Sequence, residues 1–361
     1  MKKKDKMKRL GILLLALTAI TVIITFVIVM NLSDPTDQKG QPQEQFDDSY
    51  SGWIRNVYIM SNKDNEIIIL YDKTNYIAKG IAQNDYTGVA DIELSHGKIT
   101  RILAKPDGIE GILDRYSETE VQIKDYEALS YDDTLPVYVV ADSPNVRQPV
   151  HQIAMSDLVI GNSKVKLIVA DEKACAVVQY SKDIANNIRV LLKNGNNITY
   201  SDLYIKSNKT YTVNEKKVKA KKLTKVSSYL KGKKNGEEIC ISPATGKLFI
   251  CNRKGKKLAE AYEGNFIVRK ETGGYVLINE LSVEDYVRYV LPSEMPLGFS
   301  YEALKAQAVC ARSYAIKQMA GKRLAALGAH VDDSVAFQVY NNLREDAASI
   351  AAVNETKGQV V

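Results

Sequence analysis

One carboxylate in this sequence is distinguished by its neighbours. Glu294 lies between Pro292 and Pro296, in the run Leu-Pro-Ser-Glu-Met-Pro. Each proline fixes its own φ angle and pushes the residue before it toward extended backbone geometry. The pattern therefore predicts that Glu294 is held on a short, stiff, non-helical segment. A rigidly aimed carboxyl group is suited to general acid–base chemistry, because the proton must be delivered in one direction.

A helix is predicted directly after this segment, over residues 301–320. Ser300 is a suitable N-cap, and apolar side chains then recur at helical spacing. They form one stripe that consists mostly of alanine: Leu304, Ala308, Ala311, Ala315 and Met319. Polar side chains flank the stripe in pairs seven residues apart, Lys305 with Arg312 and Gln307 with Tyr314. Such side chains either reach into a cleft or extend past the apolar surface to water.

The segment 291–315 resembles the signature of the SpoIID/LytB family, the stage II sporulation protein D domain. The matching motifs are Pro-Ser-Glu-Met-Pro around Glu294, Glu-Ala-Leu-Lys-Ala-Gln-Ala-Val from Glu302, and Ala-Arg-Ser-Tyr-Ala from Ala311. Looser matches extend the resemblance over about residues 187–361. This resemblance implies that the protein is a peptidoglycan lytic transglycosylase that acts in cell-wall remodelling or sporulation.

The resemblance also implies a mechanism. One Glu cleaves the bond between N-acetylmuramic acid (MurNAc) and N-acetylglucosamine (GlcNAc), first as acid and then as base, and leaves 1,6-anhydro-MurNAc ends. Carried over to this sequence, Glu294 is the catalytic residue. The positions that match the motif and become candidates for substrate binding are Lys305, Gln307, Arg312 and Tyr314. The alternative is a non-catalytic cell-wall-binding protein that enhances a partner amidase.

The sequence departs from the family pattern in two places. Family members usually continue well past the strand that here ends at Val361, so the sequence predicts a SpoIID-like domain that lacks its C-terminal part. Some members also hold zinc with one His and two Cys, whereas the corresponding region here keeps only His330, followed by Asp332, Asp333 and Gln338. Since a structural zinc ion takes four ligands, we expect no metal and no cofactor.

The N-terminus predicts a membrane anchor. Six basic residues precede the uncharged, apolar run Leu10–Met30, whose 21 residues span about 30 Å as a helix. The basic flank favours a cytoplasmic tail and an extracytoplasmic bulk, so the protein is expected in the cell membrane as a single-pass protein. A cleaved signal peptide is the alternative, although its apolar core is shorter and ends at small residues.

The remaining chain indicates an α+β protein with little helix. We expect a tail and anchor over 1–31, a flexible linker over 32–51, a mainly β extracytoplasmic domain of unknown role over 52–185, and the β-rich SpoIID-like domain over 186–361. The middle domain shows short strand-like runs separated by turn signals, typical of a barrel or sandwich. Eight strands are predicted there: Glu66–Tyr71, Tyr76–Ala82, Val89–Leu94, Lys98–Ala104, Val121–Asp125, Pro136–Ala141, Lys164–Ala170 and Ala174–Tyr180. Residues 343–352 predict a further short helix.

Charge and cysteine usage add weaker indications. Positive charge is concentrated in the segment 216–257, which has 14 Lys or Arg and only two Glu, whereas the net charge of the whole chain is +6. Outside a cell this segment could face anionic wall polymers, or its lysines could simply protect strand edges. No nucleic-acid motif is present, and we expect no nucleic-acid partner.

Cys240 and Cys251 would lie opposite each other on a hairpin that turns at Thr245-Gly246, either as a disulfide or as two reduced thiols.

Overall fold

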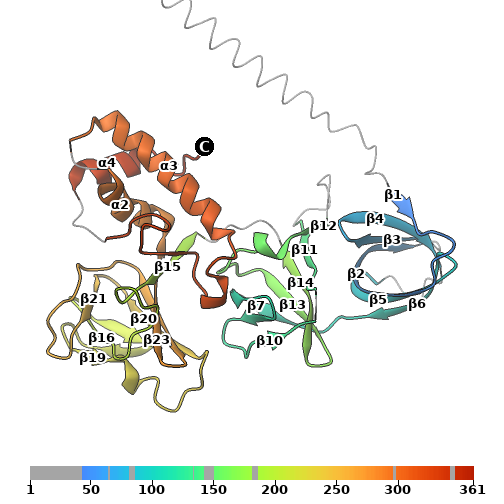
Figure 1. The fold of residues 1–361 in the computed structure, drawn as a ribbon, viewed down its shortest axis with the longest axis horizontal. Coiled ribbons are helices and arrows are strands. Elements are labelled where there is room, and N and C mark those ends of the chain that lie inside the picture. Colours follow the sequence, from blue (N-terminus) through green and yellow to red (C-terminus); the bar gives the residue numbers. More distant parts are fainter. Residues whose placement is uncertain are drawn as a thin grey trace, which may run out of the picture. The chain divides into compact units, whose positions relative to one another are not determined.

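A computed structural model of the chain describes residues 43–63, 66–80, 86–132, 134–141, 150–180, 186–295, 298–341 and 346–361 (Figure 1). In these ranges the protein is mostly β, with a small group of helices near the C-terminus. The predicted anchor, Leu10–Met30, and most of the predicted linker lie outside the described residues. Among the residues that the structure describes, no helix has the length and hydropathy needed to cross a membrane.

The predicted middle domain consists of two β units. In the first, strands β4, β3, β2, β5 and β6 are neighbours in that order, around a core of Ile and Val side chains. Strand β2 is the longest and was not predicted. The strands are β1 (Gln43–Gln45), β2 (Gly52–Lys63), β3 (Glu66–Tyr71), β4 (Thr74–Lys79), β5 (Gly88–Ser95) and β6 (Lys98–Ala104).

The second β unit combines a five-stranded sheet, in the order β12-β11-β14-β13-β7, with a three-stranded sheet, β10-β9-β8. All pairs in the larger sheet are antiparallel except β11 with β14. The strands are β7 (Gly108–Gly111), β8 (Leu113–Tyr116), β9 (Glu120–Ile123), β10 (Leu129–Ser130), β11 (Val137–Val140), β12 (Val150–Ile153), β13 (Val165–Ala170) and β14 (Lys173–Tyr180). A short 3₁₀ turn, Met155–Asp157, follows β12.

The C-terminal half is built on a seven-stranded sheet with the order β18-β17-β20-β22-β23-β15-β24, beside a three-stranded sheet, β19-β16-β21. The larger sheet contains one parallel pair, β15 with β24, which aligns Leu191 with Asp332. The strands are β15 (Asn187–Leu192), β16 (Tyr204–Ser207), β17 (Tyr211–Val213), β18 (Lys216–Val218), β19 (Thr224–Lys225), β20 (Glu238–Pro243), β21 (Leu248–Cys251), β22 (Asn265–Glu271), β23 (Gly274–Ser282) and β24 (Val331–Asp332).

Three helices complete this half: α2 (Val283–Glu294), α3 (Tyr301–Met319) and α4 (Ala347–Glu355). Helix α3 agrees with the predicted span, and the Ser300 side chain accepts a hydrogen bond from the Ala303 amide, as a cap does. The alanine stripe is confirmed as its buried face, and its five members belong to the largest hydrophobic core together with side chains of α2 and α4. Small side chains allow α2 and α4 to approach α3 closely.

Helix α2 corrects the prediction for Glu294. The residue is not on a non-helical segment; it is the last residue of α2, and Pro292 lies inside the last turn. The helix begins with Ser282, which accepts from the Asp285 amide and donates to the Asp285 carboxylate. Pro292 near the helix end removes only one helical hydrogen bond. Met295, by contrast, is extended (φ −128°, ψ 113°), as expected before Pro296, which lies outside the described residues.

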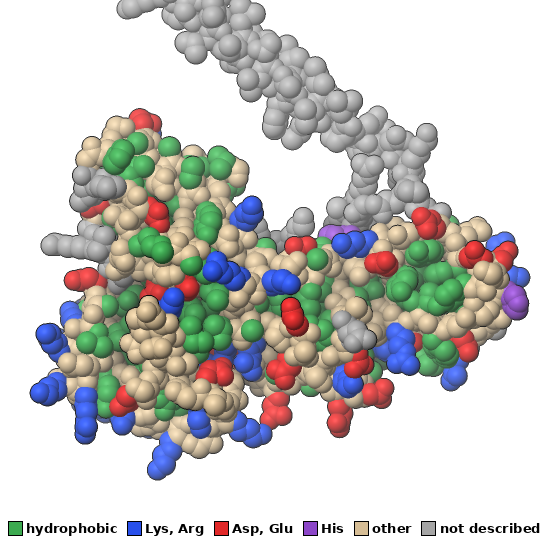
Figure 2. Space-filling model, viewed as in Figure 1, with side chains coloured by type: hydrophobic (Ala, Val, Ile, Leu, Met, Phe, Trp, Pro, Cys, Tyr) green, Lys and Arg blue, Asp and Glu red, His purple; other side chains and the backbone are tan. Residues whose placement is uncertain are grey.

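The predicted hairpin between Cys240 and Cys251 is wrong. Cys240 lies on β20 and faces Ile267 across the large sheet, whereas Cys251 lies on β21 and faces Tyr204 in the smaller sheet. The chain crosses from one sheet to the other at the expected turn, so both cysteines are free thiols. The basic side chains of segment 216–257 are largely exposed, and Figure 2 shows Lys and Arg gathered on the surface around β16, β19, β20 and β21.

A buried charge network joins β8 to the C-terminal sheet. Asp114 accepts hydrogen bonds from Arg189 at 2.8 Å and from Arg269 at 3.1 Å, and both guanidinium groups are nearly inaccessible to water. Arg189 also binds Glu280 at 2.8 Å, and Arg269 binds Glu238 at 3.2 Å. Burial and the neighbouring Asp114 raise the pKa of Glu238. Hereafter these five residues are called the arginine network.

Candidate functional site

The Glu294 carboxylate stands at the end of α2, exposed to solvent. Its Oε1 atom accepts a hydrogen bond from the Val339 amide at 2.6 Å. Val339 belongs to the segment that follows β24, so the contact joins two parts of the chain that are far apart in sequence. One oxygen is thereby fixed by the backbone, and the carboxylate has a defined direction.

An aromatic cluster holds the segment that supplies this amide. Tyr340 is buried, and its hydroxyl donates to Asn279 Oδ1 at 2.9 Å. Its ring stacks on Tyr286 of α2, with centroids 5.3 Å apart, and packs edge-on against Tyr289 of the same helix at 6.1 Å. Tyr340, the residue next to Val339, is therefore anchored to the helix that carries Glu294. This core packing fixes the position of the Val339 amide relative to the Glu294 carboxylate.

Beside Glu294 lies a buried tyrosine hydroxyl. Tyr286 is fully buried, and among the described residues its hydroxyl has no hydrogen-bond partner. Burial, followed by the proximity of Tyr314, Glu294 and Asp332, raises the pKa of Tyr286. Since α2, α3 and β24 supply these groups, the three elements converge at this hydroxyl. A buried, unpaired hydroxyl costs folding free energy.

The end of β24 and the residue after it add two carboxylates that the sequence did not identify as site residues. Asp332 is mostly buried, accepts from the Ser334 amide at 2.8 Å and lies 3.9 Å from Lys193 Nζ. Asp333 accepts from the Lys193 amide at 3.2 Å, and burial raises the pKa of Asp333 to about 6. The parallel pairing of β15 with β24 brings Asp332 near Tyr286 of α2, and no local pattern signals such a long-range pairing.

The structure separates the four predicted binding residues into two groups. Gln307 and Tyr314 lie on one flank of α3, and Tyr314 is among the groups that act on Tyr286 beside Glu294. Lys305 lies on the other flank, where it contacts Glu302 at 2.9 Å and Glu355 at 3.2 Å. The structure thus places Tyr314 near Tyr286, on which Glu294 also acts, and directs Lys305 toward α4.

Arg312 is buried and fully engaged. Its Nε and Nη2 atoms bind the two oxygens of Glu284 at 2.9 and 2.8 Å, and Nη1 donates to the Gln359 carbonyl at 2.9 Å. Glu284 lies in the first turn of α2, ten residues before Glu294, which corresponds to about 15 Å along the helix. Arg312 therefore fixes the beginning of α2, at the opposite end from the exposed carboxylate.

His330 serves as a buried connector. Its Nδ1 atom accepts from the Arg189 amide at 3.0 Å, which leaves Nε2 to donate to the Ile160 carbonyl at 3.0 Å. Complete burial, then the charge of Arg189, lowers the pKa of His330 to about 3, so the ring is neutral. In the parts of the chain that the structure describes, no group of three or more His, Cys, Asp or Glu could hold a metal ion. The expected absence of a metal stays a prediction.

Fold and site together define a class: a mainly β protein in which a three-helix group presents one exposed carboxylate at a helix end. Residues 271–361 match the family model described as SpoIID, stage II sporulation protein. This match confirms the resemblance to the SpoIID/LytB family. It begins near the end of β22 and covers β23, all three helices and β24.

Curated relatives agree with that assignment. Stage II sporulation protein D of Bacillus subtilis is 39% identical over 82 residues, which cover 22% of this chain and 24% of that protein. The amidase enhancer of Bacillus subtilis is 43% identical over 72 residues, 20% of this chain and 9% of that protein. An uncharacterized protein of Brachyspira hyodysenteriae is 38% identical over 100 residues, 27% of each chain. The matched segments thus span less than a third of each of these relatives, and no solved structure matches.

Proposed function

We propose that this protein is a membrane-anchored peptidoglycan lytic transglycosylase and that Glu294 is its single catalytic acid and base. The observation that carries the proposal is the geometry of Glu294, an exposed carboxylate at a helix end with one oxygen fixed by the Val339 amide at 2.6 Å. The second oxygen is left to face a substrate. A bound sugar would cover the carboxyl group and favour its protonated form, which the first step requires.

The proposed reaction consumes no water. Glu294 donates its proton to the glycosidic oxygen, and the bond from that oxygen to C1 of MurNAc breaks. The 6-hydroxyl of the same MurNAc then attacks C1, and its proton returns to the Glu294 carboxylate. The products are a 1,6-anhydro-MurNAc end and a GlcNAc hydroxyl, and Glu294 is regenerated in its protonated form.

The neighbouring residues take supporting roles in this proposal. Gln307 and Tyr314, which share one flank of α3, are assigned to sugar hydroxyl and acetamido groups. Lys305 and Arg312 are assigned to the support of the helices, since their charges are neutralised by Glu355 and Glu284. Asp332 is a second carboxylate near the site, and ordinary glycosidases use such a second group as nucleophile or base.

The test uses purified, peptide-free glycan strands and mass analysis of the products. The wild-type protein should produce anhydro-MurNAc ends, and Glu294→Gln should reduce turnover at least about 10²-fold, the low end of a general acid's contribution. Glu260→Gln, an exposed carboxylate outside the helices, is the matched control and should keep full activity. Reducing ends in place of anhydro ends would reject the mechanism and favour a hydrolase with Asp332 as its base.

A second function has its own support. A relative named amidase enhancer matches this chain at 43% identity, and Lys305 and Arg312 are engaged within the fold. The alternative is a non-catalytic wall-binding protein that stimulates a partner amidase. It predicts no glycan cleavage by the purified protein and a faster release of stem peptides when the protein is added to a peptidoglycan amidase. Glu294→Gln would leave this stimulation intact.

A further inference from the structure

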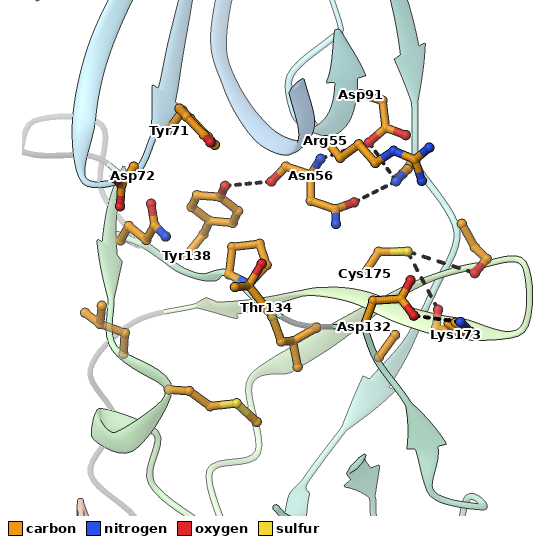
Figure 3. A pocket seen from close by; sticks show the side chains of 18 of the residues that line it. Arg55, Asn56, Tyr71, Asp72, Asp91, Asp132, Thr134, Tyr138, Lys173 and Cys175 are labelled. Carbon is orange, nitrogen blue, oxygen red and sulfur yellow. Dashed lines mark hydrogen bonds and ion pairs between the residues drawn. The ribbon is translucent and has the colours of Figure 1, made fainter. Parts of the chain in front are cut away.

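A polar cleft lies between the first and second β units, away from Glu294 (Figure 3). Its volume is about 850 Å³, within the range of sites that enclose small ligands. The walls come from β2, from the turn between β3 and β4, from β11 and β12, and from the turn between β13 and β14. Such sites are usually apolar, whereas this one is lined mainly by charged and polar groups, which favours a hydrophilic ligand.

The floor of the cleft is preformed by hydrogen bonds. Asn56 takes a left-handed backbone conformation (φ 56°), and its amide donates to Asp91 at 2.8 Å. Lys105 binds both Asp91, at 2.7 Å, and the Asn56 side chain, at 2.6 Å. The Tyr138 hydroxyl donates to the Asn56 carbonyl at 2.7 Å. The polar groups of the floor are thus paired with one another, so the floor keeps its shape without a ligand.

The charges of the cleft are balanced. Four cationic and four anionic side chains line it: Arg55, Lys73, Lys105 and Lys173 with Asp72, Asp91, Asp132 and Asp171. Lys105 with Asp91, and Lys173 with Asp132, form ion pairs. Within the described residues, the charged groups of Arg55, Lys73, Asp72 and Asp171 form no hydrogen bond or ion pair, although Arg55 lies near enough to Asp132 to help Lys173 lower the pKa of that carboxyl group. Charges of both signs therefore remain available, and a polymer of one charge sign would meet repulsion as well as attraction.

The available charges are separated along the cleft. Figure 3 places Asp72 at one side, Arg55 at the other, and the Tyr138 ring between them. A ligand that reaches both Asp72 and Arg55 would carry an ammonium group at one end and a carboxylate at the other, with a slender polar body over the tyrosine. An extended peptide with both charges satisfies this requirement.

We propose that this cleft binds a zwitterionic peptide, with its ammonium group on Asp72 and its carboxylate on Arg55. The identification of that peptide as the stem peptide of the cell wall rests on the proposed function. Stem peptides carry a side-chain ammonium group and free carboxylates. The first two β units would then bind the peptides of a cross-linked wall layer while the site around Glu294 acts on the glycan strands of that layer.

The test is isothermal titration calorimetry on the full chain, purified in a mild detergent. The probe is the synthetic peptide N-acetyl-L-Ala-γ-D-Glu-L-Lys-D-Ala, whose one ammonium group is the lysine side chain, and the matched probe carries an acetylated lysine side chain. We expect saturable binding of the first peptide that weakens with added salt, and about tenfold weaker binding of the acetylated one, the loss typical of one charge-assisted hydrogen bond. No saturable binding up to millimolar peptide would overturn the proposal.

Variants locate the site. Asp72→Asn and Arg55→Gln should each weaken binding about tenfold. Glu66→Gln and Arg101→Gln, which remove exposed charges from the same sheet outside the cleft, should not. Equal affinity in all four variants would overturn the proposal. Polyglycerol phosphate serves as the anionic alternative; if it binds this cleft more tightly than the peptide, the ligand is a wall polyanion and the peptide proposal fails.

The two proposals fail separately. Cleavage of peptide-free glycan strands does not involve the cleft, so Asp72→Asn and Arg55→Gln should cleave such strands at the wild-type rate. Peptide binding without any glycan cleavage would reject the catalytic proposal and leave this one standing. Cleavage without peptide binding would reject only this one.

Discussion

The arginine network makes a quantitative prediction, because it contains three carboxylates and two guanidinium groups. Arg269→Met removes one of the two positive charges and leaves Asp114 and Glu238 buried against Arg189 alone. Loss of one partner from a buried ion pair typically costs 3–5 kcal/mol, and we expect about 4 kcal/mol here. Asp114→Asn is milder, because Arg189 keeps Glu280 and Arg269 keeps Glu238, and the amide oxygen still accepts a hydrogen bond. We expect a cost of about 1–2 kcal/mol.

The assay is urea unfolding followed by far-ultraviolet circular dichroism. In the double variant the removal of one positive charge is partly compensated by the removal of one negative charge. Its cost should therefore be smaller than the sum of the single costs by about 1–2 kcal/mol, a coupling typical of residues in one network. An Asp114→Asn variant as destabilised as Arg269→Met, or strictly additive effects, would refute the reasoning that charge imbalance governs this cluster.

Three further predictions concern other parts of the chain. Because the pKa of His330 is about 3 in the folded state and 6.5 in the unfolded state, only the unfolded state binds the extra proton as the pH falls below 6.5. The free energy of unfolding should therefore decline by up to about 1.4 kcal/mol per pH unit below pH 6.5. Urea titrations at pH 7 and 5 should show that His330→Gln lacks this contribution. Ala311→Leu should overpack the buried face of α3 and lower stability by about 1–3 kcal/mol, and an unchanged melting temperature would contradict that packing. Protease added to intact protoplasts should remove the chain after about residue 32, whereas protection of residues 52–361 would exclude the extracytoplasmic orientation.

Local sequence patterns predicted part of the fold well. Helix α3, its cap at Ser300 and its alanine stripe follow from spacing alone, and strands β3 and β6 agree with the predicted bounds. These elements were predictable because each is specified by residues a few positions apart. Strand β2 was missed, since its register is irregular at two places and its burial alternates imperfectly.

The incorrect prediction for the backbone at Glu294 arises where two local sequence rules conflict. Pro292 suggested an extended segment, yet the capping pair Ser282 and Asp285 and the apolar spacing of Tyr286, Val287 and Val290 favour a helix that extends through it. The preference of proline for extended neighbours does not prevail here, because near a helix end the loss of one hydrogen bond is small. The crossing between β20 and β21 was missed for a related reason, since a turn signal does not state whether the two strands pair.

The candidate site could be predicted only in part. Glu294 and Tyr314 were identified from the motif, but Asp332, Asp333 and the Val339 amide depend on the pairing of β24 with β15, which brings together residues about 140 positions apart. Sequence spacing alone also could not tell that Arg312 faces Glu284. The resemblance marks both flanks of α3, and only the three-dimensional arrangement distinguishes Tyr314, which lies near Tyr286, from Lys305, which binds α4.

For the proposed reaction, the contact between Arg312 and Glu284 would have a kinetic consequence. Helix α2 is held at its first turn by this ion pair and carries the carboxylate at its other end, so a small rotation at the held end becomes a displacement of the carboxyl group. In a proposed reaction where a hydroxyl must attack along one line, such a displacement lowers the effective molarity of the reacting groups without changing their acidity. Loosening the ion pair should therefore slow turnover at every pH alike, and the shape of the pH–rate profile should be preserved.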